Sequence, residues 1–156
     1  MASITEGELR KRGVNAKNLG EMATLARERG LPINEETSIE AQLWILHRQF
    51  SEELAYSDPN KLPPRYDAII CDRGPDNYCY LERSFGKDEY ALQMTLSHLR
   101  RFPYSQIYLL PILDTDIVDD GTRSTDIAFQ KEMDHRIRKF FDTHEIKHIE
   151  LPILDQ

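Results

Sequence analysis

The chain of 156 residues is long enough for one domain with a single core, spanning residues 1–156, and 40% of its residues are apolar. No apolar run approaches the roughly 20 residues of a membrane-spanning helix, and the first residues lack the pattern of a signal peptide. The formal net charge of −7 argues against general nucleic-acid binding, because phosphate backbones favour basic surfaces. Cys71 and Cys79 form neither a disulfide framework nor a zinc motif, so we expect a cytoplasmic protein without membrane contact.

Five segments have the signals of helices. In chain order they are residues 4–12, 21–29, 38–56, 88–101 and 126–143. Gly13 and Gly30 follow the first two, as helix C-caps often do. The third carries an apolar stripe at spacings of three and four residues, formed by Ile39, Leu43, Leu46, Phe50 and Leu54. From residue 74 to residue 77 the pattern is irregular, an aromatic cluster follows, and no further helix is expected before residue 88.

Four short apolar segments have the signals of strands. They are residues 14–19, 66–71, 106–111 and 147–151, the first of them weakly signalled. Strands that alternate with helices predict an α/β fold with a largely parallel sheet. Ligands of such sheets bind beyond the carboxyl ends of the strands. This rule places Glu21, the pair Asp72–Arg73 and the 112–126 loop at one edge of the sheet.

Asp72 and Arg73 directly follow the most convincing strand. An acid in this position can hold Mg²⁺ or accept a proton from a substrate hydroxyl. The neighbouring arginine can contact phosphate oxygens and stabilise the charge that spreads over them in the transition state. A helix N-cap with a surface ion pair explains the same two residues equally well.

Two further charged residues are candidates for the same edge. Arg123 lies in a glycine-containing loop, which suits a lid over phosphates, although a solvated loop is the simpler interpretation. Glu21 could orient a substrate hydroxyl, or it could be an acid in the first turn of a helix. The loop also contains a run of acids that a metal-dependent hydrolase could use, but their pattern is not that of a calcium loop: Asp114, Asp116, Asp119 and Asp120.

Taken together, these segments resemble the small P-loop nucleoside and nucleotide kinases, and most closely the AAA-type ATPase and nicotinamide riboside kinase-like family. The resemblance depends on the order and spacing of motifs along nearly the whole chain. The motifs are Leu9 to Gly13, Glu21, Gly30 to Asn34, the helix containing Gln42, Tyr66 to Gly74 with Asp76 and Tyr80, and Asp119 to Asp126 with Phe129–Gln130.

The resemblance implies a P-loop NTPase-like α/β fold with a three-layer, mostly parallel sheet. It implies ATP and Mg²⁺ as cofactors and a small nucleoside or nucleotide as partner. Asp72 would act as base or metal ligand, Arg73 would contact phosphate, and Arg123 would be the lid arginine. Glu21 would lie near the phosphoryl acceptor, and Gln42 and Arg48 would line the acceptor side.

The chain departs from this family in its phosphate-binding loop. The family begins with a strand followed by G-x-x-x-x-G-K-[ST], whose backbone N–H groups hold the triphosphate. Here the only Gly-Lys pair is Gly86–Lys87. It is followed by Asp88 instead of serine or threonine, and it lacks the upstream glycine of the motif. The resemblance therefore implies that the first, central strand and its loop are missing. A truncated kinase, a degenerate relative and a replacement of the strand by another segment are the three explanations.

Two functions follow from these observations. The first is ATP-dependent phosphoryl transfer to a hydroxyl group of a small nucleoside or nucleotide. The second is a non-catalytic binding or regulatory module derived from such a kinase, which could form a homo-oligomer that covers the open edge of its sheet.

Overall fold

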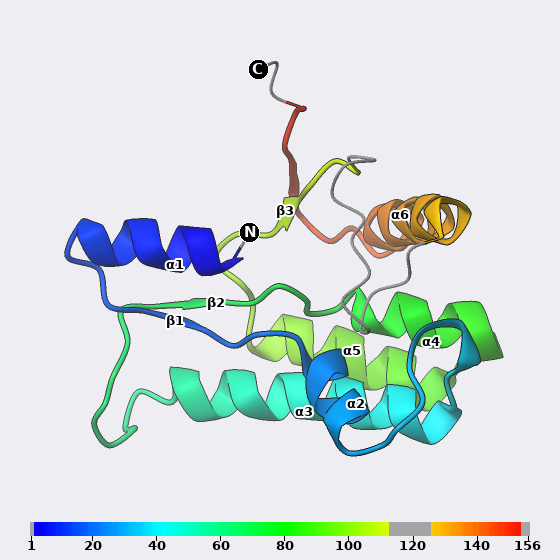
Figure 1. Ribbon diagram of the computed structural model, residues 1–156, viewed down its shortest axis with the longest axis horizontal. Coiled ribbons are helices and arrows are strands. Elements are labelled where there is room, and N and C mark those ends of the chain that lie inside the picture. Colours follow the sequence, from blue (N-terminus) through cyan, green and yellow to red (C-terminus); the bar gives the residue numbers. More distant parts are fainter. Residues whose placement is uncertain (1, 113–125, 154–156) are drawn as a thin grey trace.

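The computed structural model describes residues 2–112 and 126–153 (Figure 1). The helices in these ranges are α1 (Ala2–Lys11), α2 (Met22–Glu28), the 3-10 helix η1 (Asn34–Glu36), α3 (Ile39–Ser57), α4 (Asn77–Phe85), α5 (Glu89–Arg101) and α6 (Ile127–Thr143). The strands are β1 (Ala16–Asn18), β2 (Ala68–Ile70), β3 (Tyr108–Leu109) and β4 (Ile149–Glu150).

The described strands form two separate pairs, and both pairs are parallel. In the first pair Asn18 of β1 lies opposite Ile70 of β2. In the second pair Tyr108 of β3 lies opposite Ile149 of β4. The parallel pairing agrees with the expected α/β class. The expected three-layer sheet is not formed by the described strands, because each of them has a single partner strand.

The main core lies between helices rather than between a sheet and its helices. α3 packs against α4, and α4 packs against α6. Their fully buried side chains include Leu46, Tyr78, Leu81 and Met133. In Figure 1, α1 lies above the β1–β2 pair and α3 lies below it, so this pair is covered on both sides.

Helix α4 is the element that the sequence did not predict. Gly74 and Pro75 suggest a loop, and they do form a turn, but α4 begins two residues later at Asn77, with Asp76 as its N-cap. The N–H groups of Asn77 and Tyr78 donate to the carbonyls of Gly74 and Pro75, so the turn continues directly into the helix. Tyr78 and Leu81, three residues apart, then become fully buried.

The other predicted helices are confirmed within a few residues, and three of them begin at a side-chain cap. Ser38, Asp88 and Asp126 each accept a hydrogen bond from a backbone N–H in the first turn. In the apolar stripe of α3, Leu46 and Phe50 are buried and Ile39 and Leu43 pack against them partly buried, whereas Leu54 at the end is 40% exposed.

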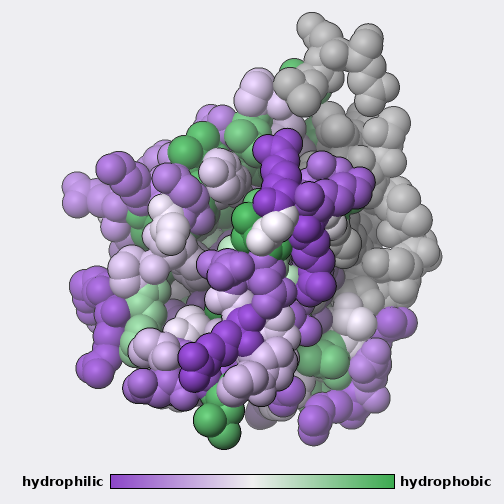
Figure 2. Space-filling model, turned by 90° about the vertical axis from the view of Figure 1, so that its left-hand side faces the viewer, coloured by the Kyte–Doolittle hydropathy of each residue, from purple (hydrophilic) through white to green (hydrophobic). Residues whose placement is uncertain are grey.

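Figure 2 shows one face of the molecule, on which hydrophilic side chains predominate and apolar residues are scattered. None of the helices within residues 2–112 and 126–153 combines the length and the apolar character needed to cross a membrane. Cys71 and Cys79 are both free, as expected.

Candidate functional site

The carboxyl ends of β1 and β2 bring Glu21 and Arg73 to the same edge. Asn18 and Ile70 are register partners, and the two charged residues follow them at equal distances along the chain. The charge of Glu21 acts on the Arg73 guanidinium. The sequence rule that parallel strands end at one edge is therefore confirmed for these two residues.

Arg73 is held on several sides. Its Nη1 lies 3.7 Å from Asp76 Oδ2, and its guanidinium carbon lies 4.2 Å from the centroid of the Tyr80 ring. Burial on its own would lower the pKa of Arg73, but Tyr80, Asp76 and Glu21 more than offset this and raise it above its ordinary value. The Arg73 side chain is 23% exposed and carries five N–H donors, so it retains donors for a ligand.

Asp76 connects this arginine to the backbone of the turn. Its Oδ1 accepts a hydrogen bond of 2.7 Å from the Gly74 N–H, while its Oδ2 faces Arg73. The carboxylate thus fixes the turn between β2 and α4 and orients the guanidinium. The sequence analysis named Asp76 and Tyr80 only as parts of a motif, and the structure shows that both contact Arg73.

Asp72 is the exposed acid of this turn. Within residues 2–112 and 126–153, no group of three or more histidine, cysteine or acidic side chains is arranged to hold a metal ion. Mg²⁺ usually takes one or two carboxylates and completes its shell with water and substrate phosphates, so a single exposed carboxylate is compatible with this ion. Asp72 is the candidate for that single carboxylate. The other two acids near the turn, Glu21 and Asp76, already interact with Arg73.

A buried polar cluster lies behind the turn, and the sequence analysis missed it. Its centre is the Glu53 carboxylate on α3, which is 8% exposed. Gln49 Nε2 and Tyr104 Oη donate to Glu53 Oε2 over 2.8 and 2.6 Å, and His98 Nε2 lies 3.1 Å from Oε1. A signal was present in the sequence, because Gln49 and Glu53 continue the helical spacing of Leu46 on the buried side of α3.

The thiol of Cys71 borders this cluster. Burial, followed by the nearby charges of Glu53 and Asp72, raises the pKa of the thiol to about 12. Since the thiolate is the reactive form, Cys71 remains a neutral thiol near pH 7.

The other predicted residues either have local contacts at α3 or lie outside the described ranges. Gln42 is buried, and its Nε2 donates to Thr37 Oγ1 over 2.9 Å. Arg48 Nε lies 3.0 Å from Glu52 Oε1 along the same helix. These contacts hold Gln42 and Arg48 to α3 and the turn before it. Arg123 and the acidic loop residues belong to 113–125, outside the described residues.

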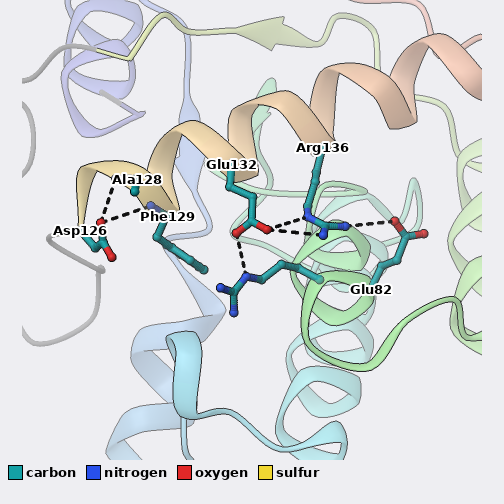
Figure 3. Close-up of polar contacts among 7 residues, drawn as sticks. Glu82, Asp126, Ala128, Phe129, Glu132 and Arg136 are labelled. Atoms are coloured by element: carbon teal, nitrogen blue, oxygen red, sulfur yellow. Dashed lines mark hydrogen bonds and ion pairs between the residues drawn. The ribbon is translucent and has the colours of Figure 1, made fainter.

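A charge network fixes α4, which carries the turn at its start, against α6 (Figure 3). Glu132 on α6 accepts a hydrogen bond of 3.0 Å from Arg83 Nε on α4. Arg136 lies between Glu132 and Glu82, with nitrogen–oxygen distances of 3.4 and 3.9 Å. The guanidinium of Arg83 also lies 5.0 Å from the centroid of the Phe129 ring.

Comparison with protein-family models decides the family. A model described as AAA domain matches residues 8–155, nearly the whole chain. The chain belongs to this AAA domain family. Membership supports a P-loop NTPase-like α/β fold and a nucleotide-binding type of function for the present AAA domain. No curated protein matches the chain.

Proposed function

We propose that this AAA domain takes part in ATP-dependent phosphoryl transfer to a hydroxyl group of a small nucleoside or nucleotide. The observation that carries the proposal is the juxtaposition of an exposed acid with a constrained arginine beyond two parallel strands. Asp72 supplies a carboxylate for Mg²⁺ or for the proton of the acceptor hydroxyl. Arg73 keeps its contact with Asp76 and uses its remaining N–H groups for phosphate oxygens.

Glu21 has a second role in this proposal. A carboxylate can accept several hydrogen bonds through its two oxygens, and a hydroxyl group is a suitable donor. Glu21 would thereby orient the acceptor next to the transferred phosphoryl group. Gln42 and Arg48 keep only the structural contacts described above, and their proposed place on the acceptor side depends on the family resemblance alone.

The phosphate-binding loop is part of the proposal. The sequence contains no G-x-x-x-x-G-K-[ST], and each described strand has an edge without a partner strand. We propose that a strand paired with one of these edges, with a loop beside it, would complete the phosphate site. Such a strand would widen that pair toward the larger sheet that the family resemblance implies.

Isothermal titration with Mg·ATP tests the proposal. We expect binding that Asp72→Asn weakens by at least about tenfold, the usual loss when one charged ligand of a site is removed. Asp142→Asn, which changes an exposed acid on α6, is the matched control and keeps the affinity of the unsubstituted chain. Equal affinities for Asp72→Asn and Asp142→Asn would refute the role of Asp72.

A non-catalytic binding module is the second candidate. The absence of a phosphate-loop motif from the sequence favours it, and so does the pairing of Arg73 with acids of the same chain. ADP release during incubation with Mg·ATP and a panel of nucleosides distinguishes the two candidates. Turnover that depends on Asp72 excludes the module, and binding without turnover excludes the kinase.

A further inference from the structure

We propose that Glu53 and Tyr104 are positioning residues that hold the turn between β2 and α4 in the geometry its ligand requires. The functional part of this inference rests on the proposed nucleotide site, because the turn carries Asp72 and Arg73. The structural part does not depend on it. Neither residue follows a strand of the candidate edge, so each would act through the turn rather than by contact with the substrate.

Tyr104 is held in place by a hydrogen bond to Glu53. Its hydroxyl donates to Glu53 Oε2 over 2.6 Å, a short distance that is typical of an O–H donor and a carboxylate. Burial, with the charge of Glu53 next in importance, raises the pKa of Tyr104 well above its ordinary value, so the phenol keeps the proton that it donates. The ring therefore has one well-defined position.

Glu53 is itself held by polar side chains from more than one element. Gln49, one helical turn earlier on α3, donates to the same oxygen as Tyr104. His98 on α5 contacts the other oxygen over 3.1 Å, and its ring stacks on Phe50 with the centroids 3.9 Å apart. A buried carboxylate with three polar partners loses freedom to move, because any displacement leaves one of them unpaired.

Tyr104 lies against the turn at Gly74. A Cβ built on Gly74 would lie only 2.7 Å from Tyr104 Oη and 3.1 Å from Cζ. The Gly74 backbone thus packs directly against the phenol, with no room for a side chain. On its other side the Gly74 N–H is held by Asp76 Oδ1. The turn is enclosed between the fixed phenol and the carboxylate that also faces Arg73.

The consequence is that the Asp72–Arg73 backbone has a support that does not depend on the ligand. A site that is already ordered before binding avoids the entropy cost of ordering it on binding. Removal of the Tyr104 hydroxyl should loosen the turn while the helical core of α3, α4 and α6 stays folded.

Amide hydrogen exchange of the Tyr104→Phe variant is the first test. Within residues 73–77, we expect exchange at the Gly74 and Asn77 amides to accelerate by about tenfold or more, as for the loss of a hydrogen bond to a charged group. Tyr90→Phe is the matched control, because it also removes one tyrosine hydroxyl. That hydroxyl is exposed, belongs to α5 and lies 2.9 Å from His47 Nε2 on α3. Equal exchange at residues 73–77 in Tyr104→Phe and Tyr90→Phe overturns the proposal.

A double-mutant cycle tests the contact itself. Gly74→Ala should destabilise the chain strongly, because its methyl group meets Tyr104 Oη. Combination with Tyr104→Phe removes that oxygen, so the double variant should be more stable than the sum of the single effects predicts. Additive effects overturn the packing step. If Gly74→Ala does not fold, the exchange experiment on Tyr104→Phe still decides the matter.

Mg·ATP titration of the same Tyr104→Phe variant separates this inference from the proposed function. Weaker binding than in Tyr90→Phe, together with faster exchange in the turn, supports both. No binding by the unsubstituted chain refutes the proposed function, and the exchange result alone then judges the positioning role. Unchanged affinity in a variant whose turn exchanges faster overturns the claim that the turn positions the ligand.

Discussion

Glu21 and Arg73 occupy equivalent positions after two strands that pair in parallel register. Each lies three residues beyond one member of the register pair Asn18 and Ile70, and the charge of Glu21 acts on the Arg73 guanidinium. A connection between residues 52 positions apart in the sequence thus follows from strand direction alone. It makes Arg73 a link between β1, β2 and α4 as well as a candidate ligand.

Replacement of Arg73 should therefore affect folding. Arg73→Met removes the positive charge that interacts with both Asp76 and Glu21. We therefore expect a loss of about 2 kcal/mol in the free energy of unfolding. Urea unfolding measures it. Arg73→Lys should recover only part, because an ammonium group does not stack on Tyr80 as a guanidinium does. A loss no larger than that of Arg12→Met, at an exposed position, would contradict the linking role.

Replacement of Asp72 should leave folding unchanged. This side chain is exposed, so Asp72→Asn is expected to alter the free energy of unfolding by no more than about 0.5 kcal/mol. Thermal unfolding of the variant beside the unsubstituted chain measures this. The contrast with Arg73→Met separates a residue kept for a ligand from one kept partly for the fold. A large loss of stability in Asp72→Asn would indicate a structural role instead.

The core between α3 and α4 should be sensitive to cavities. Leu46 is fully buried, so Leu46→Ala should cost about 3 kcal/mol of unfolding free energy through lost contacts and the cavity that remains. Leu62→Ala is the control, since Leu62 is 78% exposed and its truncation should cost little. Equal denaturation midpoints for the two variants would show that α3 does not pack as described.

The charge network on α6 should make stability depend on pH. The hydrogen bond from Arg83 holds the pKa of Glu132 below its ordinary value of 4.5. The contribution of Glu132 is therefore complete above that value and is lost as the pH falls through the lower pKa of the folded state. The stability difference between the unsubstituted chain and Glu132→Gln should be present near pH 7 and shrink near pH 3.

Urea unfolding at both pH values tests this prediction. Glu89 is a suitable comparison, because its hydrogen bond to Gln93 also lowers its pKa but stays within α5. Glu89→Gln should show a smaller difference, since a pair within one helix does not hold two helices together. A difference for Glu132→Gln that does not change with pH would mean that the network contributes nothing through charge.

Local patterns in the sequence predicted most elements but not their assembly. The spacing in residues 38–56 predicted α3, because helical periodicity is a local property of the sequence. Helix α4 was missed because Gly74 and Pro75 are ordinary signals of a turn. The separation of the strands into two pairs depends on contacts distant in sequence, which no local pattern reports.

The candidate site was predicted in the same uneven way. Asp72, Arg73 and Glu21 were predicted as site residues because strand ends mark them, and the structure brings Glu21 and Arg73 to one edge. The support behind them was missed, since Tyr104 lies in an irregular segment and Glu53 looks like an ordinary charge on a long helix. Only the fold shows that these two residues meet, and that Gly74 has no room for a side chain because of them.

The shared acceptor at Glu53 has a consequence for the evolution of this family. Gln49, His98 and Tyr104 come from different parts of the chain but all contact the Glu53 carboxylate. A change at any one of these positions therefore leaves a buried polar group without a hydrogen-bond partner. Relatives should inherit the four positions as a set, or replace them together with apolar residues. An alignment of homologous chains should accordingly show strong covariation among positions 49, 53, 98 and 104.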